Sequence, residues 1–240
     1  MENKVVLNWS SGKDAAMAYH LLTQQGVAVR SLLTTLSADY NRVFMHGVRE
    51  DLLDMQAHRM ELPLVKVKLP ASPNDELYKN AMLHVLTTFK ESGITTAAYG
   101  DIFLEDLRTY REQQLAIAEF KALFPLWKKD TRQLVADVED AGIEAIIVCV
   151  NDKYLDKSFL GRKIDRQLLA DLPTNVDACG ENGEFHTFVY NAPFFSAPIN
   201  ITQGEAVHKS YESGDGKVWD SGFWFLDVMV DQPCHPSSQT

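Results

Sequence analysis

Two hydrophobic periods alternate along the first half of the chain. Short apolar runs rich in β-branched residues, typical of buried strands, are separated by longer stretches whose apolar residues recur every three or four positions, as in amphipathic helices. In one of these stretches, Leu77, Ala81 and Val85 fall on a single helical face. The pattern predicts strands at residues 5–9, 27–36, 64–69 and 95–99 and helices at residues 14–25, 48–60 and 75–92.

Strands that alternate with helices predict an α/β fold with a parallel sheet and right-handed crossovers. Ligands bind such sheets outside the carboxyl ends of the strands. Two segments rich in polar residues and glycine follow predicted strands, namely residues 10–14 and the pair Gly100-Asp101. We therefore expect these two segments to lie at the same edge of the sheet.

The second half of the chain has a different pattern. A highly charged helix is predicted at residues 104–123, and Pro125 marks a break after it. Helices are then predicted at residues 131–141 and 164–172, and strands at 144–150, 187–190, 199–210 and 223–230, with a turn at 213–216. We predict a first domain at residues 1–125, a smaller α/β domain at 126–230 that closes over it, and a mobile tail at 231–240.

The turn after the first predicted strand has the composition of an anion-binding site. It reads Ser10-Ser11-Gly12-Lys13-Asp14 and opens directly into a helix. Backbone N–H groups at a helix N-terminus point at a bound anion, the helix dipole adds partial positive charge, and Lys13 adds a full charge. Phosphate suits such a site, although a serine-rich turn that only caps the helix explains the same residues. Neither a Walker A motif nor a Gly-x-Gly-x-x-Gly fingerprint is present at this turn.

A second segment, at residues 179–187, combines glycine with charge. It reads Cys-Gly-Glu-Asn-Gly-Glu-Phe-His-Thr and places the carboxylates of Glu181 and Glu184 close in sequence to His186. Its two glycines and its asparagine permit positive φ angles and a close approach of the backbone. Such a cluster favours a ligand site, while composition alone leaves a hairpin turn with solvated charges as an equal alternative.

Charge and cysteine content narrow the function classes. The 240 residues carry 33 acidic and 23 basic side chains, a net charge of −10, which argues against nucleic-acid binding and against an anionic membrane surface as a partner. The three cysteines are widely spaced and contain no Cys-x-x-Cys, so they predict neither a disulfide framework nor a zinc site. The N-terminus lacks a signal-peptide pattern, so we expect a cytoplasmic protein, and the sequence leaves a homo-oligomer open.

The turn at residues 10–14 resembles the pyrophosphate loop (PP-loop) of the ATP pyrophosphatases. Those enzymes usually read Ser-Gly-Gly-Lys-Asp-Ser, and here Ser11 replaces a glycine and Ala15 replaces a serine. Up to about Phe195, the order of motifs is similar to that of the diphthine–ammonia ligases, and the chain resembles their bacterial branch. After the loop, these motifs are Gly100-Asp101-Ile102, Arg108, Arg111-Glu112, Leu126-Trp127 and the Gly-Glu-x-Gly-Glu block at residues 180–184.

This resemblance implies a HUP-type, Rossmann-like domain of the adenine nucleotide alpha hydrolase kind, followed by a smaller domain that supplies an acceptor pocket. It also implies that ATP is cleaved to AMP and pyrophosphate, and that a carboxylate acceptor is adenylated and then amidated by ammonia or an amine. The eukaryotic and archaeal ligases typically read Gly-Glu-Gly-Gly-Glu-Tyr-Glu-Thr where this chain reads Gly-Glu-Asn-Gly-Glu-Phe-His-Thr. We therefore expect ATP chemistry with an acceptor other than diphthine.

The loop residues receive roles toward the nucleotide. Ser10, Ser11, Gly12 and Lys13 would hold the β and γ phosphates, and Lys13 would balance charge as pyrophosphate departs. Asp14 would hold Mg²⁺ that bridges the phosphates, or would serve only as a favourable charge in the first helical turn.

Three residues outside the loop are also expected to face the nucleotide. Asp101, next to Gly100, would coordinate Mg²⁺ or the ribose, with an N-cap of the following helix as the alternative. His46 would approach adenine or ribose through backbone atoms, or would simply be a loop residue before the next helix.

The remaining candidates are assigned to the acceptor and to ammonia. Arg108 and Arg111 would grip a phosphate or an acceptor carboxylate, or would pair with nearby glutamates on a solvated helix face. Glu181 and Glu184 would bind ammonium or accept its proton. His186 would act as a general base, or would only satisfy a backbone carbonyl. The acceptor pocket would be lined by Gly180, Asn182 and Gly183.

Two further functions are open at this point. An ATP-binding sensor without turnover is compatible with the glycine and the serine that the loop lacks. RNA thiolation, which other proteins with this loop perform, usually requires a paired or nucleophilic cysteine and a basic surface, and the sequence shows neither.

Overall fold

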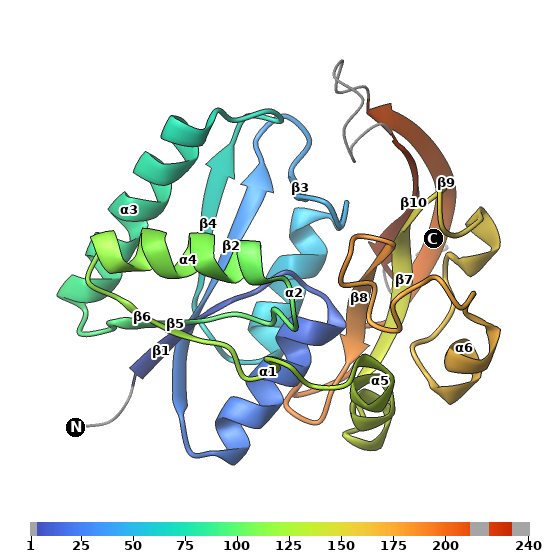
Figure 1. Cartoon of the computed structure of the whole chain (residues 1–240), viewed down its shortest axis with the longest axis horizontal. Helices are drawn as coiled ribbons and strands as arrows, with labels where there is room; N and C mark the ends of the chain where they lie inside the picture. The colour runs from blue at the N-terminus through green and yellow to red at the C-terminus, as the bar shows by residue number, and fades with distance from the viewer. Residues whose placement is uncertain (1–3, 212–220, 232–240) are drawn as a thin grey trace, which may run out of the picture.

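Two β-sheets, one mainly parallel and one antiparallel, divide the chain (Figure 1). The computed structural model describes residues 4–211 and 221–231. The predicted turn at residues 213–216 and the predicted tail beyond residue 231 lie outside this part. Within the described residues, no helix is both long and apolar enough to cross a membrane.

The first sheet confirms the predicted α/β class. Its parallel strands follow the order β4-β2-β1-β5-β6, and the short β3 runs antiparallel to the end of β2. Leu32 of β2 pairs with Leu7 of β1 on one edge and with Leu64 of β4 on the other. The strands are β1 (Lys4–Asn8), β2 (Ala28–Ser37), β3 (Arg42–Val43), β4 (Leu64–Leu69), β5 (Thr96–Ala98) and β6 (Lys121–Leu123).

Helices cover both faces of this sheet because the side chains of each strand alternate between the faces. Val5 and Leu7 of β1 join a buried cluster with α1 and α2, whereas Val6 joins a separate cluster with α3 and α4. The fold is therefore doubly wound, in the Rossmann-like manner. The four helices are α1 (Lys13–Gln24), α2 (Glu50–Arg59), α3 (Asp75–Glu91) and α4 (Glu105–Ile117).

The predicted helix at residues 104–123 is wrong in its last part, residues 118–123. The helix α4 ends at Ile117, and Glu119 adopts a φ of 59°, a left-handed conformation that a helix cannot continue. Phe120 then turns into the core, and residues 121–123 form β6, which pairs in parallel with β5. This edge strand has only three residues and closely follows the highly charged α4, so the periodicity of the sequence does not predict it.

The second sheet is antiparallel, with the strand order β8-β7-β10-β9. Its central strand β7 (Glu144–Asn151) is buried almost throughout. One buried cluster joins this sheet to α1 and α2, so the predicted boundary near residue 125 stays a prediction. The other elements are α5 (Thr131–Asp140), the 3₁₀ helix η1 (Lys157–Phe159), α6 (Arg166–Asp171), β8 (Phe185–Asn191), β9 (Ile201–Tyr211) and β10 (Ser221–Val230).

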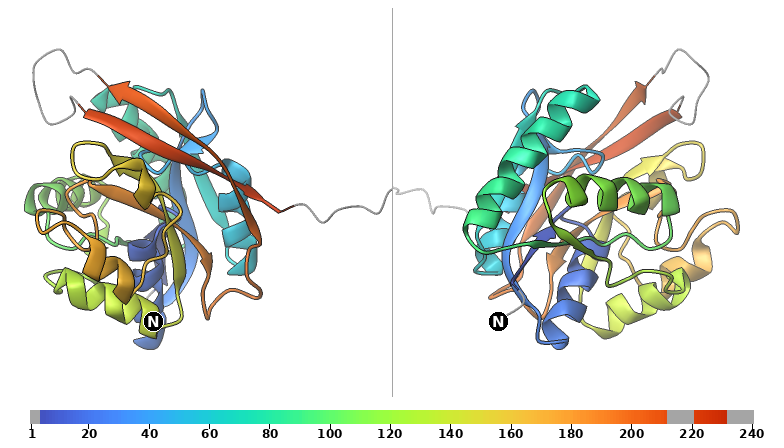
Figure 2. Two further views of the ribbon diagram at one scale, coloured as in Figure 1. Left: turned by 90° about the vertical axis from the view of Figure 1, so that its right-hand side faces the viewer. Right: turned by 60° about the vertical axis from the view of Figure 1, so that its left-hand side comes forward.

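An ionic junction ties the two sheets together at β10, which lies beside α2 (Figure 2). The carboxylate of Asp227 accepts hydrogen bonds from Arg42 of β3 at 2.8 Å and from Arg49, which precedes α2, at 2.6 Å. These hydrogen bonds lower the pKa of Asp227 to about 2.

We expect Asp227→Asn to lower the free energy of unfolding by about 1–2 kcal/mol at pH 7, because both arginines lose their carboxylate. The folded pKa of about 2 lies below the ordinary value of 3.8. The stabilisation is therefore present above pH of about 4 and is lost as the pH falls through about 2. Denaturant unfolding measures both effects. Asp171→Asn, which removes the carboxylate of the Arg162–Asp171 ion pair, is the control. Equal stability of the wild type and Asp227→Asn at pH 7 would contradict the expectation.

Candidate active site

The serine–glycine–lysine loop lies at the carboxyl end of the central strand. The loop connects β1 to α1, and β1 has β2 on one side and β5 on the other. This is the point in a doubly wound sheet where the chain reverses its winding and where ligands bind. Gly12 occupies the N-cap position of α1, and no side chain caps this helix. The alternative that the serine-rich turn only caps the helix therefore does not hold.

The loop packs tightly against strand β8 of the second domain. A Cβ atom at Gly12 would lie 2.9 Å from Cε1 of His46 and 3.0 Å from Oγ1 of Thr187, so only glycine fits there. Ser11 has a φ of 74°, and its buried hydroxyl has no hydrogen-bond partner among the described residues. This strained position is the one at which the related loops usually carry glycine.

Hydrogen bonds join the loop directly to the segment at residues 179–189. The backbone N–H of Lys13 donates to Oγ1 of Thr187 at 3.0 Å, and the N–H of Val189 donates to the carbonyl of Ser11 at 3.0 Å. The ammonium of Lys13 donates to the carbonyl of Cys179. The structure thus brings the two segments that the sequence singles out into direct contact across the two domains.

Lys13 is the buried cation of this contact, with a side chain that is 2% exposed. Its ammonium lies 2.9 Å from the carboxylate of Asp14 and 5.2 Å from the ring centroid of Phe185. Burial alone would lower the pKa of Lys13, but Asp14 and the other anionic neighbours outweigh burial and raise it. Burial raises the pKa of Asp14 in turn, against the opposing effect of Lys13.

Two neutral histidines stack beside the loop. The rings of His46 and His186 are 4.6 Å apart, and Nδ1 of His46 lies 3.1 Å from the carbonyl of Thr187. Burial lowers the pKa of His46 to about 4 and, together with His46 and Lys13, lowers the pKa of His186 well below 6.5. Nε2 of His186 is buried without a hydrogen-bond partner among the described residues, so the ring does not satisfy a backbone carbonyl through that atom.

Glu181 reaches from the second domain to the end of β5. One carboxylate oxygen accepts hydrogen bonds from the N–H groups of Ile102 at 2.7 Å and Phe103 at 3.3 Å. Burial, with Asp14 and Asp101 as anionic neighbours, raises the pKa of Glu181 to about 7.

Gly100 brings the end of β5 against the first turn of α1. A Cβ atom at Gly100 would lie 2.8 Å from the carbonyl carbon of Asp14. The two strand ends singled out by the sequence therefore adjoin one another, as the parallel-sheet argument expects.

Glu184 holds the glycine segment in shape. Its buried carboxylate accepts hydrogen bonds from the N–H of Asp177 and from both the N–H and the side-chain amide of Asn182, each at 3.0 Å. The N–H of Gly183 donates to the carbonyl of Gly180, which closes the turn. The segment is a turn, which is the alternative that its composition left open, but the carboxylate of Glu184 is buried rather than solvated.

The two arginines have separate partners. Arg111 forms an ion pair with Asp101 at 2.6 Å and lies over the ring of Tyr99. Arg108 pairs with Glu112 at 2.8 Å and lies over Trp127, which matches the ion-pair alternative. Asp101 does not cap α4, because Leu104 is the N-cap residue.

Gln56 is a buried residue beside the loop that sequence motifs do not reveal. Its amide donates to the carbonyls of Ser11 at 3.1 Å and Val189 at 2.7 Å, and its oxygen accepts from the Trp9 indole at 2.8 Å. This side chain bridges the loop and β8 within the core. A polar residue on the otherwise apolar face of α2 was the available signal, since the other buried residues of that helix are Leu52, Leu53 and Ala57.

The two cysteines among the described residues, Cys149 and Cys179, are both buried, which disfavours their reactive thiolate forms. The thiol of Cys179 donates to the carbonyl of Thr131, and burial raises its pKa far above the usual range. Cys149 lies in the core strand β7, and burial raises its pKa as well.

The loop, the strand order and the buried lysine define the class of this protein: a nucleotide-binding α/β domain of the PP-loop kind with a second domain packed on the loop. Residues 3–115 match the family described as the diphthamide synthase N-terminal domain, and residues 130–221 match the diphthamide synthase C-terminal domain. The chain therefore belongs to the diphthamide synthase family, an enzyme family, which confirms the predicted resemblance; the bacterial branch stays a prediction.

The relatives include proteins named diphthine–ammonia ligase. The Schizosaccharomyces pombe protein is 27% identical over 223 residues, which cover 84% of this chain and 36% of that protein. The Danio rerio protein is 26% identical over 225 residues, with 82% and 86% covered, and the Rattus norvegicus protein is 27% identical over 232 residues, with 85% of each covered. This chain thus spans about a third of the yeast protein and most of the fish and rat proteins.

Glu181→Gln tests the electrostatics of this site, because it keeps an oxygen acceptor for the Ile102 amide and removes the charge. The folded pKa of about 7 lies above the ordinary 4.5, so folding disfavours the ionised form. The contribution of Glu181 to stability is therefore complete below pH of about 4.5 and is lost as the pH rises through about 7.

We expect the wild type to lose about 1–3 kcal/mol of unfolding free energy relative to Glu181→Gln between pH 5 and pH 8. Urea unfolding of the ligand-free protein measures the difference. Glu91→Gln, at an exposed site that ends α3, should show no such dependence, and a pH-independent difference at Glu181 would contradict the expectation.

Proposed function

We propose that this protein is an ATP-dependent ligase that releases AMP and pyrophosphate. In this proposal, a carboxylate oxygen of the acceptor attacks the α phosphorus and pyrophosphate leaves. Ammonia or an amine then attacks the acyl carbon, AMP leaves, and one proton passes to a base. Family membership and the names of the relatives support this activity. The observation that carries it is the buried Lys13, held at the N-terminus of α1 against the glycine segment of the second domain.

Unpartnered polar atoms support ATP as the ligand of the loop. The buried hydroxyl of Ser11 and the buried Nε2 of His186 each lack a partner among the described residues. The carbonyl of Cys179 holds the Lys13 ammonium at the position where a phosphate oxygen would bind it. A phosphate carries more negative charge than a carbonyl, so ATP would take Lys13 from Cys179 and break this hydrogen bond between the loop and the glycine segment.

Mg²⁺ fits this site only with help from the nucleotide. Among the residues that the structure describes, no three His, Cys, Asp or Glu side chains gather as a metal site. Asp14 would therefore contribute one oxygen, and phosphates and water would contribute the rest, as Mg²⁺ commonly prefers. Arg111 already pairs with Asp101, which makes Asp101 the weaker candidate.

Roles in the proposed reaction follow from the surroundings of each residue. Ser10, Ser11, Gly12 and Lys13 hold the phosphates, and Lys13 stabilises the charge of departing pyrophosphate. The buried Nε2 of His186, which has no partner among the described residues, is placed to receive the proton of the attacking amine. Glu181, with a pKa of about 7, is the second candidate base.

The other predicted residues act through position rather than chemistry in this proposal. Glu184 fixes the turn at Gly180, Asn182 and Gly183, which in turn places the Cys179 carbonyl. His46 packs against Gly12 and so lies within reach of the nucleotide.

An ATP sensor without turnover remains the second candidate, because Ser11 replaces the usual glycine and the second domain covers the loop. Incubation with Mg-ATP, ammonium and a panel of carboxylates separates the two functions. AMP and pyrophosphate release with at least one acceptor identifies the ligase, whereas tight ATP binding without AMP across the panel identifies the sensor.

We expect Lys13→Met to lower pyrophosphate release about 10²–10³-fold and to weaken ATP binding, because the variant removes the charge that faces the phosphates. Methionine keeps most of the buried stem, which limits the loss of packing. Pyrophosphate release and calorimetric ATP titration measure the two effects. Lys128→Met, at an exposed lysine on the surface, is the matched control, and normal kinetics of Lys13→Met would contradict the assignment.

Glu184→Gln should behave as a loop variant rather than as a base variant. Its amide nitrogen cannot accept a hydrogen bond, so one of the N–H groups held by Glu184 loses its partner. We expect ATP affinity to stay within about threefold and product formation to fall about tenfold, without a change in the shape of the pH–rate profile. A shifted pH profile would instead make Glu184 the titrating base.

A further inference from the structure

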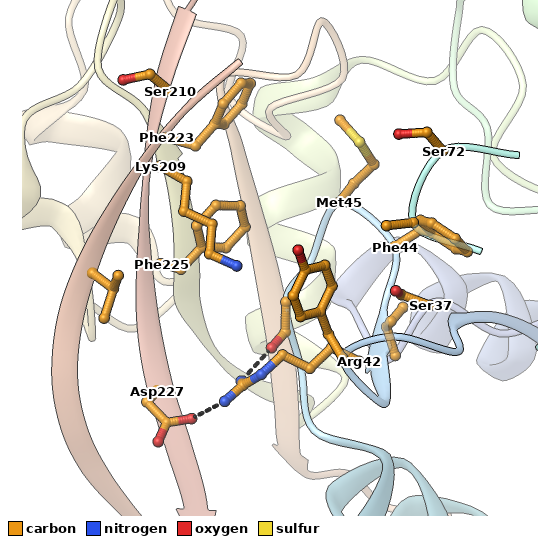
Figure 3. A pocket seen from close by; sticks show the side chains of 15 residues that line it. Ser37, Arg42, Phe44, Met45, Ser72, Lys209, Ser210, Phe223, Phe225 and Asp227 are labelled. Carbon is orange, nitrogen blue, oxygen red and sulfur yellow. Dashed lines mark hydrogen bonds and ion pairs between the residues drawn. The ribbon is translucent and has the colours of Figure 1, made fainter. Parts of the chain in front are cut away.

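A cavity of about 800 Å³ lies beside the loop but outside it (Figure 3). It opens between the segments that follow β2 and β4 in the first domain and the β9–β10 pair of the second domain. Gly47 lines the cavity, and the preceding residue, His46, packs against Gly12. A small ligand would fit a volume of this size. Only His46 separates the cavity wall at Gly47 from the phosphate loop at Gly12.

The walls of the cavity are aromatic on both sides. Phe44 and Met45 come from the first domain, and Phe223 and Phe225 face them from β10 (Figure 3). At the rim, Tyr40, Met45 and Val207 are 60%, 43% and 46% exposed, although all three are large and apolar. Exposed apolar side chains gathered around one concave site indicate a ligand with a broad apolar face.

One polar group in the wall lacks a partner. Ser37 ends β2 and lines the cavity, and its buried hydroxyl has no hydrogen-bond partner among the described residues. A buried hydroxyl without a partner is costly, so a polar atom of the ligand is the expected partner.

The cavity also carries excess positive charge within a chain of net charge −10. The ammonium of Lys209 lies 4.6 Å from the ring centroid of Tyr40 and has no carboxylate partner in the described part of the chain. Arg42 and Asp227, which pair with each other, also line the cavity, so its lining carries two cations and one anion. These charges predict an anionic group on the ligand.

We propose that this cavity binds the acceptor, a planar aromatic small molecule that carries an acidic group. This assignment rests on the proposed ligase function, since it is that function which requires an acceptor beside the phosphate loop. Adenine fits the cavity less well, because it is a neutral base and would leave Lys209 without an anionic partner. The phosphates of the nucleotide would remain at Lys13. In the proposal, the aromatic walls hold the ring system, Ser37 bonds one polar atom, and Lys209 pairs with the acid.

A pair of fluorescent probes that differ by one charge tests this assignment on the full-length protein. The anionic probe is 8-anilinonaphthalene-1-sulfonate, and the neutral probe is N-phenyl-1-naphthylamine, which has the same rings without the sulfonate. We expect Lys209→Met to weaken the anionic probe about fivefold or more and to leave the neutral probe within about twofold. Lys157→Met is the matched control, because Lys157 also lies over an aromatic residue of β10, Trp224, but outside the cavity.

The outcomes separate this inference from the proposed function. Unchanged binding of the anionic probe to Lys209→Met, or an equal loss of both probes, overturns the acidic-ligand assignment whatever ATP does. Stoichiometric displacement of the probe by ATP makes the cavity a nucleotide subsite and also overturns it, whereas simultaneous binding of ATP and the probe supports it. Loss of the proposed ligase function would instead appear as absent AMP release, with charge-selective probe binding intact.

Discussion

The buried ammonium of Lys13 is the constraint on which the rest of this structure depends. A lysine taken out of water is costly, by several kcal/mol, unless anions and dipoles surround it. Here Asp14, the Cys179 carbonyl and the face of the Phe185 ring supply that environment. Two of these three groups belong to the second domain. The first domain therefore cannot shield its own cation, and the position of the second domain is coupled to whatever binds Lys13.

The contacts around Lys13 form one polar region in an otherwise largely apolar interface between the two sheets, and the junction of Asp227 with Arg42 and Arg49 forms another. Gln56 and Thr187 link the loop to β8 through hydrogen bonds, which a bound phosphate could replace. The surrounding core residues are apolar. A continuous apolar core limits large domain motion. We infer that nucleotide entry changes a few hydrogen bonds at the loop rather than the relative orientation of the two sheets.

Sequence periodicity was sufficient for the sheet and for the proximity of its strand ends, because both follow from local patterns and from general rules for parallel sheets. It could not find β6, since three residues carry too little periodic signal beside the charged α4. It could not predict the role of Gln56 either, because that role consists of hydrogen bonds to the Ser11 and Val189 carbonyls, which are far away in sequence. The same limit applies to Asp101 and Arg111, whose ion pair spans the end of β5 and the side of α4.

The departure at His186 has an electrostatic consequence for the acceptor. The related ligases typically carry a glutamate at this position, next to the threonine, whereas this chain places a neutral imidazole there. Replacement of an anion by a neutral ring beside Lys13 makes the local potential more positive, and the effect is large because water is largely excluded. A more positive site disfavours a cationic acceptor and favours an anionic one. Lys209 in the neighbouring cavity, which has no carboxylate partner among the described residues, shifts the potential in the same direction, so both positions support the acidic acceptor that we propose.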